Sequence, residues 1–381
     1  MKLPLDGITV LEFCECMAGP YAGLRLADLG ARVIKIERPI IGDKTRRAQT
    51  LNMNAGNDSV LFHTVNRNKE SFEANLNNAN DLELVKKLIS KADVITHSFR
   101  FETIERLGLD YQTVSELNPR LIYAQISGYG SHGPWLDKPC QDLIAQSLSG
   151  LTWLTGNQDE HPIPFGAAVV DMVTGSNLVH AILSALIRKR RTGKGAKVEV
   201  SLMESIIDFQ FEGLTTYLNV DSSAPERSKI ANAHAYLGAP YGIYATADSF
   251  IAVAMGDITV LADAIGLEQL KQYGTDNRYY VERDLVKQLI ATQLKTNTTE
   301  YWLQALRQYE YWCSEVLTYS QLIETEGYKA IDMEMTVFRD DDIRLVTTRC
   351  PIRLNGHKIK STRAAPTLGG ANETVLRELR L

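Results

Sequence analysis

The amino-terminal third of the chain alternates between short apolar segments and longer segments with helical periodicity. ITVLEF and RVIKIE are short and rich in β-branched residues, which predicts strands. MAGPYAGLRLADLGA, which lies between them, has helical spacing, with Gly30 as its C-terminal cap. The alternation continues through NDLELVKKLISKA as a helix and DVITHSF as a strand. Strands that alternate with helices favour an α/β fold, in which helices cover both faces of a mostly parallel sheet.

The pattern changes along the chain and suggests a domain organisation. Residues 1–200 carry the alternating pattern and predict a large α/β domain, and residues 201–224 continue as a linker helix. An unpatterned loop at 222–240 leads into a smaller domain at 225–325. Residues 326–381 carry a strand and a helix again, which we interpret as a return to the large domain.

Composition and charge narrow the classes of function. The 381 residues carry a net charge of −5, which gives no sign of the basic face of a nucleic-acid-binding protein. No segment reaches about 18 consecutive apolar residues, and the first residues lack the apolar stretch of a secretory signal. We therefore expect a cytoplasmic protein that binds neither nucleic acid nor a membrane.

The cysteines favour free thiols over a metal site or a disulfide framework. They are Cys14, Cys16, Cys140, Cys313 and Cys350. Cys14 and Cys16 form a C-x-C pair, but no second pair and no nearby histidine completes a metal site. We therefore expect no bound metal.

Several nucleotide-binding and catalytic motifs are missing from the sequence. The first turn from strand to helix, CECMAGPYAG, contains Gly19 and Gly23 but no G-x-G, which excludes the dinucleotide fingerprint of NAD-dependent enzymes. The sequence also lacks G-x-x-x-x-G-K-[ST] and G-x-S-x-G, which excludes P-loop proteins and serine hydrolases of the α/β type.

Basic residues gather near the ends of the predicted strands. They are Lys35, Arg38, Lys44, Arg46, Arg47, Arg67, Lys69, Arg100 and Arg106. Ligands of open α/β sheets bind at the carboxyl ends of the strands, where cations suit a phosphate-bearing ligand. A solvated charged rim explains the same spacing equally well, so the pattern leaves both interpretations open.

Asp171 is an acid in the apolar and small-residue stretch FGAAVVDMVTG. It lies near the start of a predicted helix, where an aspartate most often caps the first turn. A buried structural acid and a catalytic carboxylate are the alternatives. The pattern alone favours the cap.

The sequence resembles the class III CoA-transferases, a family that includes formyl-CoA transferase, carnitine CoA-transferase and α-methylacyl-CoA racemase. The resemblance extends from about Leu5 to the carboxyl terminus. The segments that carry it are PLDGITVLEF, AGPYAGLRLADLGARVIKIERPIIGDKTR, NRNKES, ADVITHSFRFETIERLGLDYQTVSELNPRLIYAQISGYGSHGP, AAVVDMVTG, RTGKGAKVEVSLMES and APTLGG.

The resemblance implies a fold, an assembly and a reaction. It implies a Rossmann-type open sheet with a smaller α+β domain, and a homodimer of interlocked rings in which each CoA site draws on both subunits. Asp171 matches the family's catalytic aspartate and would attack an acyl-CoA to form an aspartyl anhydride and then an aspartyl-CoA thioester. The implied substrates are an acyl-CoA donor and a carboxylic-acid acceptor, with no permanently bound cofactor.

The resemblance also implies two sets of binding residues. The CoA-binding set is Arg38, Asn68, Lys69, Phe99, Arg100 and Arg106. The substrate-pocket set is Met17, Ala48, Gln141 and Gly256, the last in a loop that covers the active site.

Several positions depart from the family patterns, among them Phe101 and Glu102, which replace a glycine-permitted turn in the segment HSFRFE. Met17 and Ala48 stand where the formyl-CoA transferase type has Gln and Trp, which makes oxalate a poor substrate. Gln141 stands where the racemases need His, and glutamine cannot act as a proton-transfer base. We therefore expect an acyl-CoA:carboxylate CoA-transferase, with a racemase-like enzyme or a non-catalytic acyl-CoA-binding protein as the alternatives.

Overall fold

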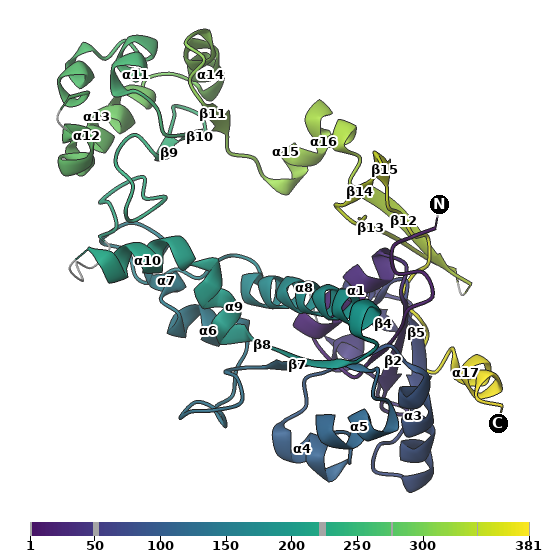
Figure 1. Ribbon diagram of the computed structural model, residues 1–381. Helices are drawn as coiled ribbons and strands as arrows, with labels where there is room; N and C mark the ends of the chain where they lie inside the picture. Colours follow the sequence, from purple (N-terminus) through teal and green to yellow (C-terminus); the bar gives the residue numbers. More distant parts are fainter. Residues whose placement is uncertain (1, 49–52, 221–225, 276, 341, 381) are drawn as a thin grey trace. The chain divides into compact units, whose positions relative to one another are not determined.

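The computed structural model describes residues 2–48, 53–220, 226–275, 277–340 and 342–380 (Figure 1). The chain divides into two compact units. Unit 1 comprises residues 1–145, 168–209 and 331–381, and unit 2 comprises residues 146–167 and 210–330.

Unit 1 is built on a six-stranded sheet in the order β5-β2-β1-β6-β7-β8, and every pair in it is parallel. Its strands are β1 (Thr9–Glu12), β2 (Arg32–Glu37), β5 (Glu70–Glu73), β6 (Val94–His97), β7 (Ile122–Ser127) and β8 (Ala196–Ser201). In chain order this is 3-2-1-4-5-6, the doubly wound arrangement in which the strand order reverses between β1 and β6. The predicted α/β fold with a parallel sheet is therefore confirmed.

One strand of this sheet, β5, was not predicted from the hydrophobic pattern. Its sequence ESFE is half acidic and lacks the apolar pattern of the other strands. β5 is an edge strand, and its Glu70 forms an ion pair with Arg32 of β2 at 2.7 Å. The outer side of β5 contacts the carboxyl-terminal segment, where the N–H of Ala371 donates to the carbonyl oxygen of Ser71 at 2.9 Å.

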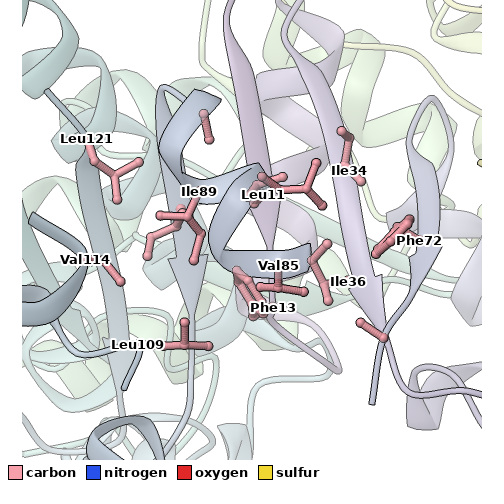
Figure 2. Close-up of a cluster of buried hydrophobic side chains, with 14 of the residues drawn as sticks. Leu11, Phe13, Ile34, Ile36, Phe72, Val85, Ile89, Leu109, Val114 and Leu121 are labelled. Carbon is pink, nitrogen blue, oxygen red and sulfur yellow. The ribbon is translucent and has the colours of Figure 1, made fainter. Parts of the chain in front are cut away.

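Helices cover both faces of the sheet. They are α1 (Ala18–Asp28), α2 (Val60–Asn66), α3 (Ala79–Lys91), α4 (Phe101–Arg106), α5 (Tyr111–Leu117), α8 (Val169–Thr192) and α9 (Leu202–Phe209). On one face, a core forms between the strands and α3, α4 and α5, with Leu11, Ile34, Phe72, Val85 and Ile89 at its centre (Figure 2).

On the other face, α1 packs closely against α8. A Cβ at Gly175 of α8 would lie 2.6 Å from the carbonyl oxygen of Ala18, so only glycine allows this approach. Gly30 follows α1 with φ +104°, as expected for a glycine that ends a helix. Among the described residues, α8 alone is long and apolar enough to cross a membrane by length and composition, a test that a core helix also meets. Its contacts with α1, α9, β7 and β8 are those of a core helix.

The remaining elements of unit 1 lie near the carboxyl terminus and beside β2. They are the short strands β3 (Asn54–Ala55) and β4 (Asp58–Ser59), the 3₁₀ helix Lys44–Arg47, the hairpins β12 (Glu334–Arg339) with β13 (Ile343–Thr348) and β14 (Arg353–Leu354) with β15 (His357–Lys358), and α17 (Asn372–Glu378). Val375 of α17 is part of the same core as β2 and α3.

Unit 2 has its own antiparallel sheet and its own core. The sheet consists of β9 (Gly242–Ala245), β10 (Phe250–Val253) and β11 (Cys313–Glu315), with β10 in the centre. Its helices are α7 (Leu151–Leu154), α10 (Phe211–Asn219), α11 (Ile258–Ala264), the 3₁₀ helix Glu268–Tyr273, α12 (Arg278–Val281), α13 (Arg283–Leu294), α14 (Thr299–Gln308) and α15 (Tyr319–Glu324). Two further helices, α6 (Asp142–Leu148) and α16 (Glu326–Ile331), lie where the chain passes from one unit to the other. Ile251, Leu261, Ile290 and Trp302 are buried in the core of unit 2.

Candidate active site at the carboxyl edge of the parallel sheet

The strand order of unit 1 reverses between β1 and β6, and a doubly wound sheet binds its ligands outside the carboxyl ends of the strands at this point. The loop at 13–17 follows β1 and leads directly into α1, and the loop at 98–100 follows β6. The two loops are joined at their base, because the N–H of Phe13 donates to the carbonyl oxygen of Thr96 at 2.8 Å.

Asp171 is the third residue of α8, and α8 starts at this same edge, because it runs back to the opposite edge, where β8 begins. Its own N–H donates to Oδ2 of Asp142 at 3.1 Å, so Asp142 accepts the hydrogen bond that a capping residue would accept. Among the described residues, none donates a hydrogen bond to the Asp171 carboxylate, and the residue at the cap position, Ala168, has no side-chain oxygen that could accept one. The cap favoured by the sequence pattern is therefore wrong for Asp171.

The surroundings of Asp171 favour its protonated form more than water does. Burial raises the pKa of Asp171 to about 6, and the negative charge of Asp142 adds to the increase. A carboxylate with this pKa is still about nine-tenths ionised at pH 7, and it has lost part of its hydration. Asp171 is thus a partly buried carboxylate that is largely ionised at neutral pH.

Two thiols lie close enough to Asp171 to interact with its charge. Burial raises the pKa of Cys16, to which Asp43, Glu15 and Asp171 also contribute, and burial and Asp171 raise the pKa of Cys140. A thiol is nucleophilic only as the thiolate, so both are poor nucleophiles at neutral pH. The described part of the chain contains no group of three or more His, Cys, Asp or Glu residues suited to a metal ion.

Comparison with known proteins identifies the family. The model of CoA-transferase family III matches residues 5–372. The chain is 32% identical to the succinate–glutarate CoA-transferase of Agrobacterium fabrum, over 99% of this chain and 96% of that protein. The chain belongs to CoA-transferase family III.

Two further relatives agree with this assignment. The acetyl-CoA:oxalate CoA-transferase of Acetobacter aceti is 34% identical over 81% of this chain and 79% of its own length. A crystal structure of a CAIB/BAIF family protein from Brucella suis covers 100% of both chains with a TM-score of 0.87 and 29% identity. As a class III CoA-transferase, the protein is a transferase that uses CoA thioesters as substrates, with an acyl-CoA donor and a carboxylate acceptor.

The basic residues near the strand ends divide into two groups in this CoA-transferase. Lys35, Arg46, Arg67 and Lys69 are buried and form ion pairs with Glu12, Asp43, Glu37, Asp58 and Asp28. Arg38, Lys44, Arg47, Arg100 and Arg106 are exposed. Neither the phosphate-site interpretation nor the solvated-rim interpretation therefore holds for the whole set.

Three residues of the predicted CoA-binding set lie at the carboxyl edge. Arg38 follows β2 and is half exposed, with Nη2 2.7 Å from Oε1 of Glu15. Phe99 and Arg100 follow β6, where Phe99 packs against Phe13 with 6.3 Å between ring centroids and Arg100 is exposed.

The other three members of that set lie elsewhere or have other partners. Arg106 donates to Oδ1 of Asn77, in the segment after β5. Asn68 has φ +64° and donates to the carbonyl oxygen of Ala27, in the last turn of α1, at the opposite edge of the sheet.

Lys69 is fully buried, and its ammonium group has protein acceptors on every side. It lies 2.9 Å from both carboxylate oxygens of Glu12 and donates to the carbonyl oxygen of Pro20 at 2.8 Å and to Oδ1 of Asn66 at 2.9 Å. An ammonium group has three protons, so these acceptors use its full donor capacity. In this structure Lys69 is a buried ion-pair residue with no proton left for a phosphate.

The predicted pocket residues lie in both units. Met17 is the residue before α1, Ala48 follows the 3₁₀ helix Lys44–Arg47, and Gln141 is exposed before α6, all in unit 1. Gly256 belongs to unit 2, between β10 and α11, where a Cβ would lie 2.5 Å from Cζ of Tyr311.

An open hollow of about 570 Å³ lies far from this edge, along the carboxyl-terminal half of α8 and on β8. Arg188, which lines it, is 17 residues beyond Asp171, or about 25 Å along the helix at 1.5 Å per residue. We therefore assign it no part in the chemistry at Asp171.

Sequence reasoning missed two carboxylates of this region. Asp142 lies 29 positions before Asp171, and no local sequence pattern links the two residues. Glu12 ends a strand of otherwise apolar residues, as Lys35 interrupts the next strand, and this pair of charges in ITVLEF and RVIKIE was the signal for a buried ion pair.

Proposed function

We propose that this enzyme is an acyl-CoA:carboxylate CoA-transferase in which Asp171 is the covalent nucleophile. The observation that carries the proposal is a partly buried carboxylate in the first turn of α8, at the ligand-binding edge of the sheet, to which no residue in the described part of the chain donates a hydrogen bond. The family membership supports it, because a CoA-transferase must conserve the energy of a thioester while it exchanges the acid.

The proposed reaction proceeds by four acyl transfers. A carboxylate oxygen of Asp171 attacks the thioester carbonyl, which forms a mixed anhydride and releases the CoA thiolate. The thiolate attacks the aspartyl carbonyl, which forms an aspartyl-CoA thioester and releases the donor acid. The acceptor carboxylate then attacks the aspartyl carbonyl, which forms a new anhydride and releases the thiolate again. The thiolate attacks the new acyl group, which gives the product acyl-CoA and regenerates Asp171.

A carboxylate suits this sequence because each acyl-aspartyl intermediate stays activated. An anhydride or a thioester can pass its acyl group on, whereas an ester on serine would lose that activation. The amino terminus of α8 carries a partial positive charge, which favours the ionised form of Asp171 and partly offsets its burial.

For CoA binding, we propose that Arg38, Phe99 and Arg100 contact the nucleotide end of the molecule. All three lie at the carboxyl edge next to the point where the strand order reverses. Arg38 is exposed, and within the described ranges its ion-pair partner is the half-buried Glu15, so it can exchange this partner for a phosphate at little cost.

For the acceptor, we propose a four- or five-carbon dicarboxylic acid in preference to oxalate. The relative from Agrobacterium fabrum is named for succinate and glutarate. Met17 and Ala48 offer apolar contacts and no polar side chain for a second carboxylate close to the first.

We further propose that the enzyme is an interlocked homodimer and that each CoA site draws on both subunits. Unit 2 exposes the large apolar side chains of Leu148, Trp153, Phe211, Leu214 and Leu218, which a second subunit could cover. Sedimentation over a dilution series should give a dimer down to nanomolar concentration. A fully active monomer would contradict the assembly and leave the chemistry intact.

The mechanism can be tested by trapping the aspartyl intermediate. Incubation with succinyl-CoA followed by hydroxylamine should convert Asp171 to its hydroxamate, detectable by peptide mass, and Asp171→Asn should abolish both the modification and the transfer of CoA to glutarate. Asp81→Asn, which changes another first-turn carboxylate of unit 1, is the matched control and should remain active. Full transferase activity in Asp171→Asn would overturn the proposal.

A further inference from the structure

Asp43 is a buried carboxylate that the proposed chemistry does not use. It is 1% exposed and lies between β2 and the 3₁₀ helix Lys44–Arg47. Its Oδ1 accepts hydrogen bonds from the N–H of Thr45 at 2.8 Å and from the hydroxyl of Thr45 at 2.7 Å. One oxygen of Asp43 thus holds the first turn of the 3₁₀ helix.

The same oxygen also contacts the loop that follows β1. The N–H of Cys16 lies 3.5 Å from Oδ1 of Asp43, at the point where Cys16 adopts a left-handed backbone conformation with φ +69°. A residue other than glycine is strained there, so the surroundings must hold it in place.

Lys35 of β2 contacts both Asp43 and the loop at 13–17. Its ammonium group is 2.8 Å from Oδ2 of Asp43, 3.1 Å from Oε1 of Glu12 and 2.6 Å from the carbonyl oxygen of Cys14. Burial opposes the charge on Lys35, but Glu12 and Asp43 outweigh it and raise the pKa of the ammonium group. Lys35 therefore stays charged and holds both Asp43 and the loop at 13–17.

The two segments that meet at Asp43 end at the two pocket positions of unit 1. The loop at 13–17 ends at Met17, and the 3₁₀ helix is followed by Ala48. We propose that Asp43, supported by Lys35, is a positioning residue that fixes Met17 and Ala48 relative to each other and thereby sets which acceptor acid the enzyme takes. This inference rests on the proposed function, because it assigns Met17 and Ala48 to the acceptor pocket.

Asp58 provides a matched control within the same buried ion network. It is 7% exposed and pairs with Arg46 of the 3₁₀ helix at 2.9 Å and with Arg339 at 3.3 Å. Neither of these two ion pairs involves the loop at 13–17. A loss of general stability should thus affect both variants, whereas a loss of pocket geometry should appear only at Asp43.

The kinetic test compares Asp43→Asn with Asp58→Asn. Asparagine keeps an oxygen that can accept from Thr45 and Cys16 but loses the charge that holds Lys35. For transfer from succinyl-CoA, Asp43→Asn should raise the KM for glutarate at least 10-fold and change the ratio of kcat/KM between glutarate and acetate at least 5-fold. Asp58→Asn should keep both within 2-fold. Unchanged acceptor KM and selectivity in a folded Asp43→Asn would overturn the proposal.

A second measurement tests whether Asp43 couples residues 13–17 to residues 44–48, and it does not depend on enzyme activity. Amide hydrogen exchange should accelerate in Asp43→Asn at residues 13–17 and 44–48 together, and in Asp58→Asn at 44–48 only. Acceleration confined to 44–48 in both variants would overturn the coupling. If the wild-type enzyme transfers CoA to no acid, the proposed function fails, and the exchange pattern still decides whether Asp43 joins the two segments.

Discussion

Two carboxylates of unit 1, Glu12 at the end of β1 and Asp171 in the first turn of α8, lie toward the same edge of the sheet and differ in their partners. Glu12 is fully buried and paired with two ammonium groups, those of Lys35 and Lys69. Asp171 is partly exposed and has no donor to its carboxylate among the described residues. The two acids therefore differ in the availability of their oxygens, which are engaged in Glu12 and open in Asp171, although both lie in apolar stretches of sequence.

The comparison explains why burial alone does not identify a catalytic acid. A buried carboxylate whose oxygens are all engaged cannot attack a carbonyl without breaking ion pairs in a medium of low dielectric constant. A carboxylate that is partly desolvated and unpaired keeps its lone pairs available, and its pKa rises instead. The following predictions test this difference, from the largest expected effect to the smallest.

The largest effect should be the loss of activity in Asp171→Asn. Removal of a covalent nucleophile removes the proposed path altogether, so we expect kcat for CoA transfer to fall at least about 1,000-fold, or about 4 kcal/mol in the barrier. The far-ultraviolet circular dichroism should be unchanged. A decrease of less than 10-fold would mean that Asp171 does not carry the reaction.

Glu12→Ala should have the opposite profile, with a large effect on folding. It removes the carboxylate with which Lys69 pairs, whereas Lys35 keeps Asp43. Breaking a buried ion pair by removing one partner typically costs about 3–5 kcal/mol. Urea denaturation should report a decrease of this size in the free energy of unfolding. A stable variant with full activity would show that water reaches this network.

Much of this architecture follows from local sequence, because the strands that carry it are apolar and short. The patterns of ITVLEF and RVIKIE predicted β1 and β2, whose register pairs Val10 with Val33 in the centre of the sheet. The pattern did not predict β5, because its sequence ESFE has one large apolar residue, Phe72, between polar ones. An ion pair between its Glu70 and Arg32 adds to the packing of Phe72.

The roles of the charged residues could not be predicted from the sequence, because they depend on partners far away in the chain. Lys69 follows two polar residues and suggests a surface position, but its carboxylate partner, Glu12, lies 57 positions earlier. The local sequence predicts that Asp171 caps a helix, but in the structure the N–H of Asp171 donates to Asp142, which lies 29 positions earlier. Tertiary contacts of this kind leave no periodic signal in the sequence.

Asp171→Asn should also stabilise the enzyme at alkaline pH. A rise of the pKa from 3.8 to about 6 means that ionised Asp171 destabilises the folded state. The cost is about 1.4 kcal/mol for each pH unit by which the pKa is raised, before allowance for partial exposure. We expect Asp171→Asn to raise the free energy of unfolding by about 1–2 kcal/mol at pH 8. The gain should shrink as the pH falls from 6 toward 4, where the folded wild type is already protonated. Equal stabilisation at pH 8 and at pH 4 would argue against a raised pKa, and Asp81→Asn is the control.

The smallest effect should be a displaced pH profile in Asp142→Asn. Asparagine keeps an oxygen that can accept the N–H of Asp171 and removes the charge that contributes to the raised pKa of Asp171. For the wild type, kcat should fall below pH about 6, because the nucleophile must be ionised. In Asp142→Asn this acidic limb should move to lower pH by less than about one unit, because burial, the larger cause, remains. The measurement is kcat from pH 4.5 to 8 for both enzymes. If kcat of Asp142→Asn is lower at every pH and falls at the same pH as in the wild type, Asp142 affects only the geometry of α8.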